Sequence, residues 1–516
     1  MTDDPNAITT LPARVRVVQR VQELYPWLLA LIGGVAIASN LFVAFRHLGT
    51  RYHLNHVASA WQALTWYAAN GELYPPLFEG GFYGGTRFAP LSILLNTIAA
   101  KISSELFTST KVVALLAMGA VLVSLYLLIV KRGAPRAVAF FLAGGIVLTE
   151  PGFYAMTSPF RGDPAPIVLQ LAALMLVAKG DTRTTRRVVI ASALCATAVF
   201  FKLTAGFAVI AIGLLLLAQD RRQLGYFCVA WFGLVIALGL FFHFVTDGRM
   251  TENLFGVATS DLGGARSIFG VPGTINYLLH ASTALTGIGV PIVVVAILRS
   301  LGRQRITLLQ LAWLASLAIL FVLFTDSGVA FNHLLAFEVT TAACIGELWA
   351  DLAAPADGFD VPRLVMAGVL AFVAYGDFDR HVADDLRMSM RATAPEHDFA
   401  AVDDLVRPGM KVLSEEPSLV IAKDMRPVVV DAWMITKIAK SQPEAQTALI
   451  DRVKAREFDR VILLDDPAAE SAKAWYSHHF GWSVVDAIVD NYALTEVRFG
   501  LRIYDRKRAS PSHLRQ

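Results

Sequence analysis

The chain has 516 residues, of which 55% are hydrophobic and only 17% are charged, and its mean hydropathy is +0.53. Soluble domains average about 25% charged residues, so this composition argues against an ordinary soluble protein. The formal net charge is only +3, which gives no reason to expect a nucleic acid as a partner. Three cysteines, Cys195, Cys228 and Cys344, fall inside predicted apolar spans and predict neither a disulfide framework nor a metal site.

Apolar residues gather in blocks of about the 20 residues that a helix needs to cross a hydrocarbon core. The sequence therefore predicts a polytopic α-helical membrane protein with about eleven transmembrane helices. The first block follows a basic N-terminus but lacks an obvious cleavage site, so we expect a first span and not a cleaved signal peptide. The predicted spans lie near residues 26–46, 110–130, 137–156, 164–179, 188–202, 204–218, 224–246, 275–298, 307–325, 328–350 and 363–378.

Short basic loops set the expected orientation. Arginine and lysine crowd the loops at 131–136, 183–187, 221–222 and 299–305, which all fall on one side together with the N-terminus. The positive-inside rule makes that side cytoplasmic and places loops 47–109, 157–163, 247–274 and 326–327 outside. Residues 90–107 resemble a further span, but counting them would invert every later loop. We expect an amphipathic helix along the outer interface there.

The first outer loop, residues 47–109, holds most of the ionisable and aromatic groups of the apolar part of the chain. Ionisable groups kept at a membrane are often functional. The stretch from Arg51 predicts a helix to about Asn70, with His53 and His56 on one face. This helix could lie at headgroup depth with no further role, or it could form a sugar-binding and acid–base surface.

A glycine-rich stretch, PPLFEGGFYGGTRFAPL, continues the loop and allows tight turns and close backbone approach. Glu79 and Arg87 in and beside it could form a catalytic or anion-binding pair, or only a salt bridge. Tyr83 is a substrate-binding candidate between them.

The second outer loop is very short and carries Arg161 and Asp163 in the stretch SPFRGDPAP. Asp163 could simply cap the next helix, which would begin at Pro164. It could also act as a base or bind a metal ion.

Two further polar positions lie at the outer ends of predicted spans. Lys202, in FFKLTAGF, could snorkel to the headgroups or hold a phosphate. The stretch FNHLLAFE adds Asn332, His333 and Glu338, and an intramembrane carboxylate is costly and more often functional than not. No phosphate-binding loop, dinucleotide fingerprint or zinc-type cysteine spacing is present in the sequence.

From about residue 380 charged residues become frequent and apolar runs shorten. The stretches MKVLSEE, RPVVVDAW and DRVILLDD and the pair ALTEV and GLRIYDR predict strands, and EAQTALIDRVKAREF predicts a helix. We therefore expect a transmembrane domain over residues 1–379 and a soluble α/β domain over residues 380–516. An odd number of spans from a cytoplasmic N-terminus places the second domain outside.

The order of these features resembles the GT-C superfamily of integral-membrane glycosyltransferases, nearest to the protein O-mannosyltransferase-like and aminoarabinose-transferase-like branch. The resemblance covers nearly the whole chain, and the order of its motifs carries it, since each motif alone is degenerate. It rests on GELYPPL and YGGTRFAPL in the first loop, the RGD loop, FFKLTAGF, NHLLAFE, and LSEEPSLVIAKDMRPVV, FDRVILL and NYALTEV in the terminal α/β domain. It implies a GT-C-like fold in the bacterial inner membrane, with the C-terminal domain in the periplasm.

The resemblance also implies a reaction. The donor would be a sugar on a polyprenyl phosphate, and the acceptor a glycan, lipid or protein of the cell envelope. A hexosyl or pentosyl group would move in a single displacement that inverts the anomeric centre. The partners would be these substrates and membrane lipids, with no nucleic acid.

In such families a carboxylate at the start of the first loop helix is the general base, and the best matching positions here are Asn55 and His56. Neither is a carboxylate, so His56, Asp163 and Glu79 are all candidates for the catalytic role. The family's second-loop acidic residue maps onto Asp163, and its lipid-side cationic position maps onto Lys202. Substrate-binding candidates are Lys202, Arg87, Arg161, His53, Asn55, Tyr83 and Glu338.

No cofactor is expected with certainty, although a divalent metal ion is possible. Two other functions stay open. A transporter or flippase of lipid-linked saccharide would show inverted repeats and polar residues near mid-bilayer, and the sequence shows no internal repeat. A non-catalytic scaffold of envelope assembly is the second, and the missing carboxylate in the first loop keeps it open.

Overall fold

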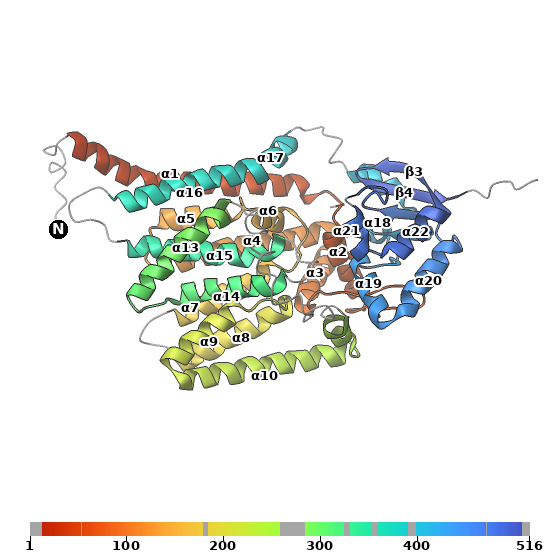
Figure 1. The fold of residues 1–516 in the computed structure, drawn as a ribbon, viewed down its shortest axis with the longest axis horizontal. Helices are drawn as coiled ribbons and strands as arrows, with labels where there is room; N and C mark the ends of the chain where they lie inside the picture. The colour runs from red at the N-terminus through yellow and green to blue at the C-terminus, as the bar shows by residue number, and fades with distance from the viewer. Residues whose placement is uncertain are drawn as a thin grey trace, which may run out of the picture.

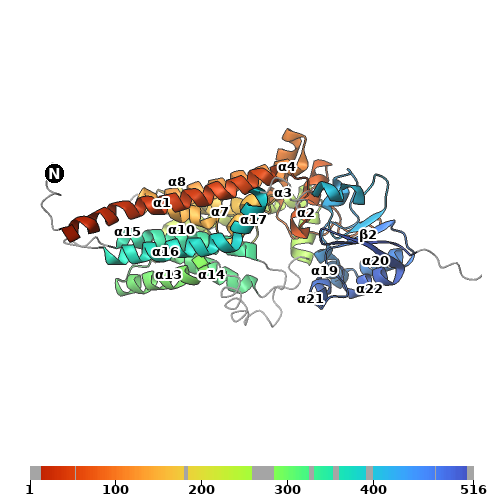
Figure 2. The ribbon, with the colours of Figure 1, turned by 90° about the horizontal axis from the view of Figure 1, so that it is seen from above.

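The computed structural model describes residues 13–52, 54–178, 184–257, 284–324, 331–352, 360–390, 399–470 and 472–507. The apolar helices form a bundle at one end of an elongated molecule, and a sheet with its own helices forms the other end (Figure 1). The helices of the first loop lie between these two parts in both ribbon views (Figures 1 and 2).

Among the described residues, four helices are long and apolar enough to cross a membrane: α1 (Ala13–Leu48), α4 (Leu106–Lys131), α10 (Arg221–Val245) and α16 (Val361–His381). The bent pair α5 (Arg136–Ile146) and α6 (Glu150–Thr157) would make a fifth if it is counted as one span. Each segment expected to span the membrane contains a described helix. The other bundle helices are α7 (Pro164–Val177), α8 (Thr185–Phe201), α9 (Phe207–Gln219), α13 (Ala284–Gly302), α14 (Leu308–Leu323) and α15 (Leu334–Asp351).

The break between α5 and α6 bends the chain by 77°. Thr149 caps α6, since its Oγ1 accepts the N–H of Gly152 at 3.2 Å, and Pro151 occupies the first turn, where a missing N–H costs nothing. The redirected α6 packs against the short 3₁₀ helix η4 (Phe331–His333), with the rings of Tyr154 and Phe331 5.1 Å apart. The bend therefore brings the second outer loop close to Asn332 and His333.

The first loop holds α2 (His56–Ala69) and α3 (Pro90–Ser103). Asn55 sets the start of α2, because its backbone is extended (φ −148°, ψ 113°) and its Oδ1 accepts the N–H groups of Val57 and Ala58. The expectation of a helix from Arg51 that carries both histidines is therefore wrong. His53 lies outside the described residues. Helix α3 has 14 residues, and the interfacial position expected for residues 90–107 stays a prediction.

The C-terminal part holds a four-stranded sheet with strand order β1-β2-β4-β3. Strands β1 (Val412–Ser414) and β2 (Arg460–Leu463) are parallel, and β3 (Tyr492–Arg498) and β4 (Leu501–Arg506) form an antiparallel hairpin. These strands and α20 (Pro443–Lys454) confirm the elements predicted for their sequences. The remaining elements of this part are α17 (Ala383–Met390), η6 (Phe399–Leu405), α18 (Ser418–Ile421), α19 (Ala432–Ser441), α21 (Ala472–His478) and α22 (Trp482–Asn491).

One predicted strand is not in this sheet. Residues 426–433 form only an isolated parallel bridge between Val429 and Tyr83 of the first loop, and Asp431 then caps α19. The Tyr83 N–H donates to the carbonyl of Val428 at 2.8 Å, and the Val430 N–H donates to the carbonyl of Tyr83 at 3.0 Å. The segment is extended, as its β-branched residues favour, but its partner comes from a distant part of the chain.

The first loop and the C-terminal part share their apolar cores. Leu77 and Tyr83 are buried in one cluster with residues of α19, α20 and α22, while Trp61 and Leu64 of α2 are buried in another with residues of β1 and β4. The Tyr83 hydroxyl donates to the carbonyl of Ala445 at 2.7 Å. The C-terminal part therefore fixes where α2 lies.

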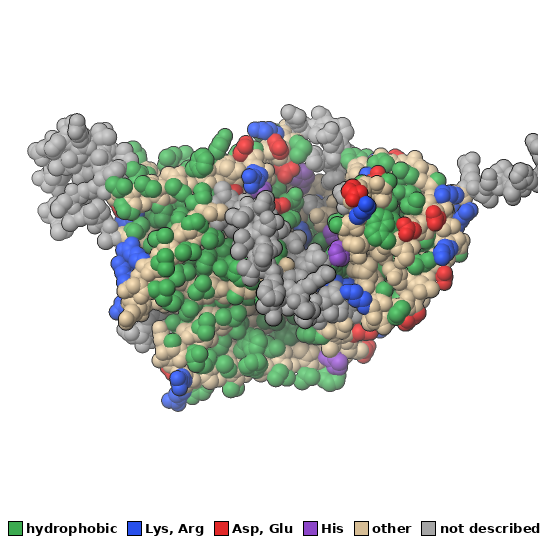
Figure 3. Space-filling view, in the orientation of Figure 1, with side chains coloured by type: hydrophobic (Ala, Val, Ile, Leu, Met, Phe, Trp, Pro, Cys, Tyr) green, Lys and Arg blue, Asp and Glu red, His purple; other side chains and the backbone are tan. Residues whose placement is uncertain are grey.

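Charged side chains are unevenly spread. Hydrophobic side chains cover the visible face of the bundle, whereas acidic and basic side chains gather over the C-terminal part and at the tips of the bundle (Figure 3). Helix α10 is the extreme case, since only 6% of its most apolar window is buried. This distribution is the one expected where lipid surrounds the bundle and water surrounds the sheet.

Candidate functional site

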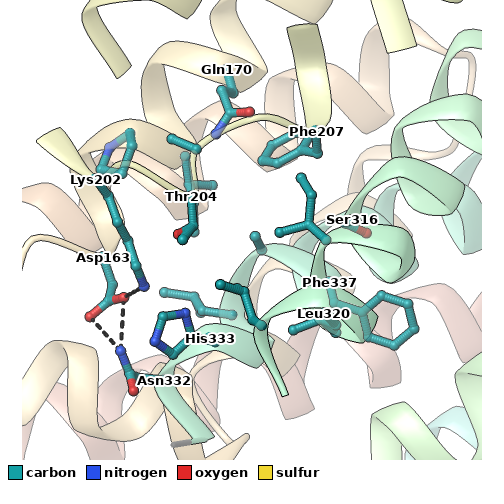
Figure 4. A pocket seen from close by; sticks show the side chains of 17 residues that line it. Asp163, Gln170, Lys202, Thr204, Phe207, Ser316, Leu320, Asn332, His333 and Phe337 are labelled. Atoms are coloured by element: carbon teal, nitrogen blue, oxygen red, sulfur yellow. Dashed lines mark hydrogen bonds and ion pairs between the residues drawn. The ribbon is translucent and has the colours of Figure 1, made fainter. Parts of the chain in front are cut away.

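A pocket lies where the second outer loop, the α8–α9 hinge and η4 meet (Figure 4). It encloses about 450 Å³ including its open mouth. Asp163, Lys202, Asn332 and His333 supply charged and polar groups at one end. The rest of the lining is mostly apolar and includes Phe207, Leu320 and Phe337, with the polar side chains of Gln170, Thr204 and Ser316 among them. The pocket thus combines a charged end with a mostly apolar wall.

Asp163 is the centre of the polar end. Its Oδ1 pairs with the Nζ of Lys202, and Nδ2 of Asn332 donates to Oδ1 at 3.1 Å and to Oδ2 at 3.3 Å. Asp163 stands at the N-cap position of α7, but its backbone is already helical (φ −74°, ψ −45°) and its side chain makes no capping bond. The carboxylate is therefore directed to Lys202 and Asn332, and not to the helix end.

Lys202 ends α8 in an extended conformation (φ −157°, ψ 120°), and the chain turns before α9 begins. This hinge places the ammonium between two apolar helices, where its side chain is 22% exposed. A lysine in that position is partly desolvated and needs an anionic partner, which Asp163 supplies.

A second, smaller cavity lies on the other side of Asp163 and is lined by Tyr154, Arg161 and Asn332 among others. Within the part of the chain that the structure describes, the Nε of Arg161 is buried and has no hydrogen-bond partner. Burial lowers the pKa of the Arg161 guanidinium, the nearby Asp163 opposes this shift and Arg87 adds to it. Arg161 therefore has an unused donor beside the carboxylate.

Three cations converge on this region. Arg87, Arg161 and Lys202 all lie within electrostatic range of His333, and the two arginines lie within range of His56. Arg87 is held from the C-terminal part, with its Nε 3.8 Å from Oδ2 of Asp431 and its guanidinium 5.1 Å from the Trp433 ring. The convergence creates a positive field where the two loops meet.

His56 is the first residue of α2 and faces this field. Enclosure of its ring lowers the pKa of His56 well below the ordinary value, and the electrostatic influence of His479, Arg87 and Arg161 lowers it further. His56 is therefore neutral near pH 7, with one unprotonated ring nitrogen.

The structure thus brings together seven of the residues singled out in the sequence: His56, Arg87, Arg161, Asp163, Lys202, Asn332 and His333. The others lie elsewhere. Asn55 uses its side chain to cap α2, Glu79 is exposed on the tight turn to Phe82, and Tyr83 is 1% exposed in the C-terminal core.

Glu338 is fully buried, and its Oε2 lies 2.7 Å from Oγ1 of Thr149 at the α5–α6 break. It is not among the residues that line either pocket. His53 lies outside the described residues.

Sequence reasoning missed the groups contributed by the C-terminal part, namely Glu415, Asp431, Trp475 and His479. The only available signal was the pair of carboxylates at the end of the predicted strand MKVLSEE, because side chains at carboxyl ends of parallel strands often line sites. Within the described ranges, no three histidine, cysteine or acidic side chains converge in a way that could hold a metal ion.

Solved structures of membrane glycosyltransferases share this fold. ArnT from Cupriavidus metallidurans in the apo state has a TM-score of 0.59 and 11% identity, over 91% of this chain and 97% of that chain. The same protein bound to undecaprenyl phosphate has a TM-score of 0.57 and 10% identity, with the same coverage. The Archaeoglobus fulgidus oligosaccharyltransferase tethered with an acceptor peptide has a TM-score of 0.53 and 14% identity, over 92% of this chain and 74% of that chain.

The chain therefore has the GT-C fold of integral-membrane glycosyltransferases. No protein-family model matches it, and no curated protein matches its sequence. At 10–14% identity the likeness defines the fold, and the chemistry has to be argued from the site.

Proposed function

We propose that this protein is a glycosyltransferase that moves a sugar from a polyprenyl-phosphate donor to an acceptor of the cell envelope. The observation that carries the proposal is the pocket that joins Lys202 and Asp163 to an apolar wall. A polyprenyl phosphate has the same division, with a charged head and a hydrocarbon tail. Structures of the same fold add support, since ArnT has been solved with undecaprenyl phosphate.

Donor binding begins at Lys202. In the structure, the carboxylate of Asp163 neutralises the ammonium. A phosphate carries more negative charge than one carboxylate and accepts several hydrogen bonds, so it competes for the three donors of the lysine. Arg161, with its free Nε, and Arg87 are the further cations that hold the phosphate as it becomes the leaving group.

Proton removal is assigned to His56. It is neutral at pH 7 and stands at the start of the first loop helix, whereas Glu79 is exposed on a turn and Asp163 is engaged by Lys202 and Asn332. His56 takes the proton of the acceptor hydroxyl, and the oxygen attacks the anomeric carbon. The bond from that carbon to the phosphate oxygen breaks, and the phosphate leaves with the electron pair. A single displacement inverts the anomeric centre.

The same proposal includes the topology. All eleven predicted segments cross the bacterial inner membrane, the N-terminus is cytoplasmic, and residues 380–516 form a periplasmic domain. The basic loops of the sequence support this arrangement, because they then all face the cytoplasm. The site would open to the periplasm and, through the apolar wall of the pocket, to the outer leaflet.

The test is a transfer assay with purified protein in nanodiscs and a panel of polyprenyl-phosphate sugars, read out by mass spectrometry of donor and acceptor fractions. Formation of a glycosylated product and free polyprenyl phosphate is the expected result. A flippase would move the lipid between leaflets with no change in its mass. Binding without transfer for every donor and acceptor would favour a scaffold.

A further inference from the structure

The C-terminal part places a compact group of polar and aromatic side chains against the start of α2. The ring of His56 lies 4.5 Å from the ring of His479 at an interplanar angle of 72°, and 4.9 Å from the ring of Trp475 at 87°. The rings of Trp475 and His479 are stacked, with centroids 3.9 Å apart. His56 is therefore held by near-perpendicular ring contacts from residues more than 400 positions later in the chain.

Glu415 contacts both Trp475 and His479 and holds them in place. Its Oε1 accepts the indole N–H of Trp475 at 2.7 Å and lies 2.9 Å from Nδ1 of His479, and its Oε2 accepts the N–H of Leu464 at 2.8 Å. Glu415 is 1% exposed and His479 is 2% exposed. A buried carboxylate facing Nδ1 puts a proton on that nitrogen, which fixes the ring orientation of His479.

Such an arrangement is costly if its only role is to join two parts of the chain. The interface between α2 and the C-terminal part already has an apolar core that includes Trp61, Leu64 and Ile503. A carboxylate and an imidazole taken out of water stabilise a fold less well than apolar side chains of the same volume. The polar group is better explained by what it does to His56, a side chain that it contacts on the side of the site.

We propose that Glu415 and His479 are positioning residues for His56, so that the C-terminal part completes the active site. Glu415 orients His479, and His479 with Trp475 fixes the His56 ring where it receives the acceptor proton. This inference rests on the proposed function. It adds that the first loop helix does not need a carboxylate of its own, because the orienting carboxylate is supplied from the end of β1.

The chemistry balances without a further reactant. The acceptor O–H bond breaks and its proton moves to an unprotonated ring nitrogen of His56. The acceptor oxygen forms a bond to the anomeric carbon as the bond to the phosphate breaks, and the proton passes to water when the products leave. The charged and titratable groups that act on His56 are Arg87 and Arg161 from the two outer loops and His479, with Glu415 behind it.

The first variants are His479→Gln and Glu415→Gln, each measured in the full-length protein in nanodiscs. Both should keep the affinity for undecaprenyl phosphate, because Lys202 and its pocket are unchanged, and both should lose at least about tenfold in kcat. Retained lipid binding shows that the variants fold. Glu457→Gln is the matched control, since it removes a carboxylate that pairs with Arg452 in the same part of the chain, and it should keep wild-type rates.

The decisive readout is the pH dependence. The electrostatic influence of His479 lowers the pKa of His56, so removing that imidazole in His479→Gln should raise that pKa. The acidic limb of kcat/KM should then move to higher pH, and so should the His56 titration followed by NMR with labelled histidine. Replacing a residue that only stabilises the fold would change the amount of active enzyme. It would leave unchanged the midpoint pH of the acidic limb of kcat/KM and that of the His56 titration.

The outcomes separate the two proposals. If the wild type transfers sugar and His479→Gln keeps both the rate and the two midpoints, the positioning role is wrong and the proposed function stands. If the wild type transfers no sugar from any donor, the proposed function is wrong and the positioning role has no reaction to serve. A lower rate in His479→Gln, with the midpoints of the kcat/KM profile and of the NMR titration displaced to higher pH, supports both the positioning role and the proposed function.

Discussion

The ammonium of Lys202 pairs with the carboxylate of Asp163, although the hinge after α8 and the loop before α7 are separate segments of the chain. The pair lies at one end of the pocket. In the proposed mechanism a ligand phosphate breaks this pair, so we expect the same two side chains to affect both donor affinity and the stability of the protein.

Replacing Lys202 with methionine tests the phosphate site. Methionine keeps the length and the apolar stem but removes the charge, and it is comfortable in a lipid environment. Donor affinity, turnover or both should fall at least about tenfold, equivalent to roughly 1.4 kcal/mol. The measurement is donor binding and turnover in nanodiscs, with Lys202→Arg as a variant that keeps the charge. Wild-type values for Lys202→Met would leave Arg87 or Arg161 as the phosphate ligand.

Asp163→Asn should separate stability from binding. The empty protein should melt at a lower temperature, because Lys202 is left partly buried without an anion. Added undecaprenyl phosphate should restore most of the loss, since it brings an anion to the same ammonium. Thermal unfolding with and without the lipid provides the measurement, and turnover should fall in parallel. Unchanged melting and turnover would show that the pair of Lys202 and Asp163 contributes to neither stability nor donor binding.

Glu416 should make stability depend on pH. Burial raises the pKa of the Glu416 carboxyl from 4.5 to about 7. A carboxyl whose folded pKa is raised loses stability as pH rises from about 4.5 to about 7, which over this span amounts to ~3 kcal/mol. Glu416→Gln should therefore melt above the wild type at pH 8 and close to it at pH 5. Equal melting temperatures of Glu416→Gln and the wild type at both pH values would contradict the burial of Glu416 in the folded protein.

Reporter fusions test the topology. A fusion after Arg387 should report a periplasmic position, because the basic loops then all face the cytoplasm. A fusion after Lys131 should report the cytoplasm and provides the matched control. A cytoplasmic signal after Arg387 would overturn the expected number of crossings.

Tyr83→Phe tests how firmly the first loop is attached to the C-terminal part. It removes only the hydroxyl that donates to the carbonyl of Ala445 and leaves that carbonyl without this donor, which should cost about 1–3 kcal/mol of stability. Turnover at temperatures well below melting should be unchanged, because Tyr83 is buried away from the pocket. A loss of turnover without a loss of stability would indicate that Tyr83 binds substrate.

Local patterns in the sequence predicted much of the structure. Apolar blocks located the bundle helices, and alternating stretches located β1, β2 and the β3–β4 hairpin. Asp163 and Lys202 were identified because charged groups beside apolar blocks are uncommon. Their pairing was not foreseen, since it depends on the hinge conformation of Lys202 and on the bend at Pro151.

Features that depend on distant pairing could not be predicted in this way. Residues 426–433 have the composition of a strand, but only the folded chain reveals that Tyr83 is the partner of Val429. In the same way, His479 and Glu415 carry no local motif that connects them with His56. The start of α2 was misplaced because Asn55 could equally have been a helical residue or a cap.

The bridge between Tyr83 and Val429 has a consequence for biosynthesis. Residues 72–89 leave the ribosome early, yet the backbone and apolar partners that order them are about 340 residues further along the chain. Until those residues are translated, the early segment lacks its backbone partner, and α2 lacks the part of its packing surface that the C-terminal part supplies. We therefore expect the newly made protein to insert its helices first. Its functional site should form only after the last quarter of the chain has crossed the membrane and folded against the first loop.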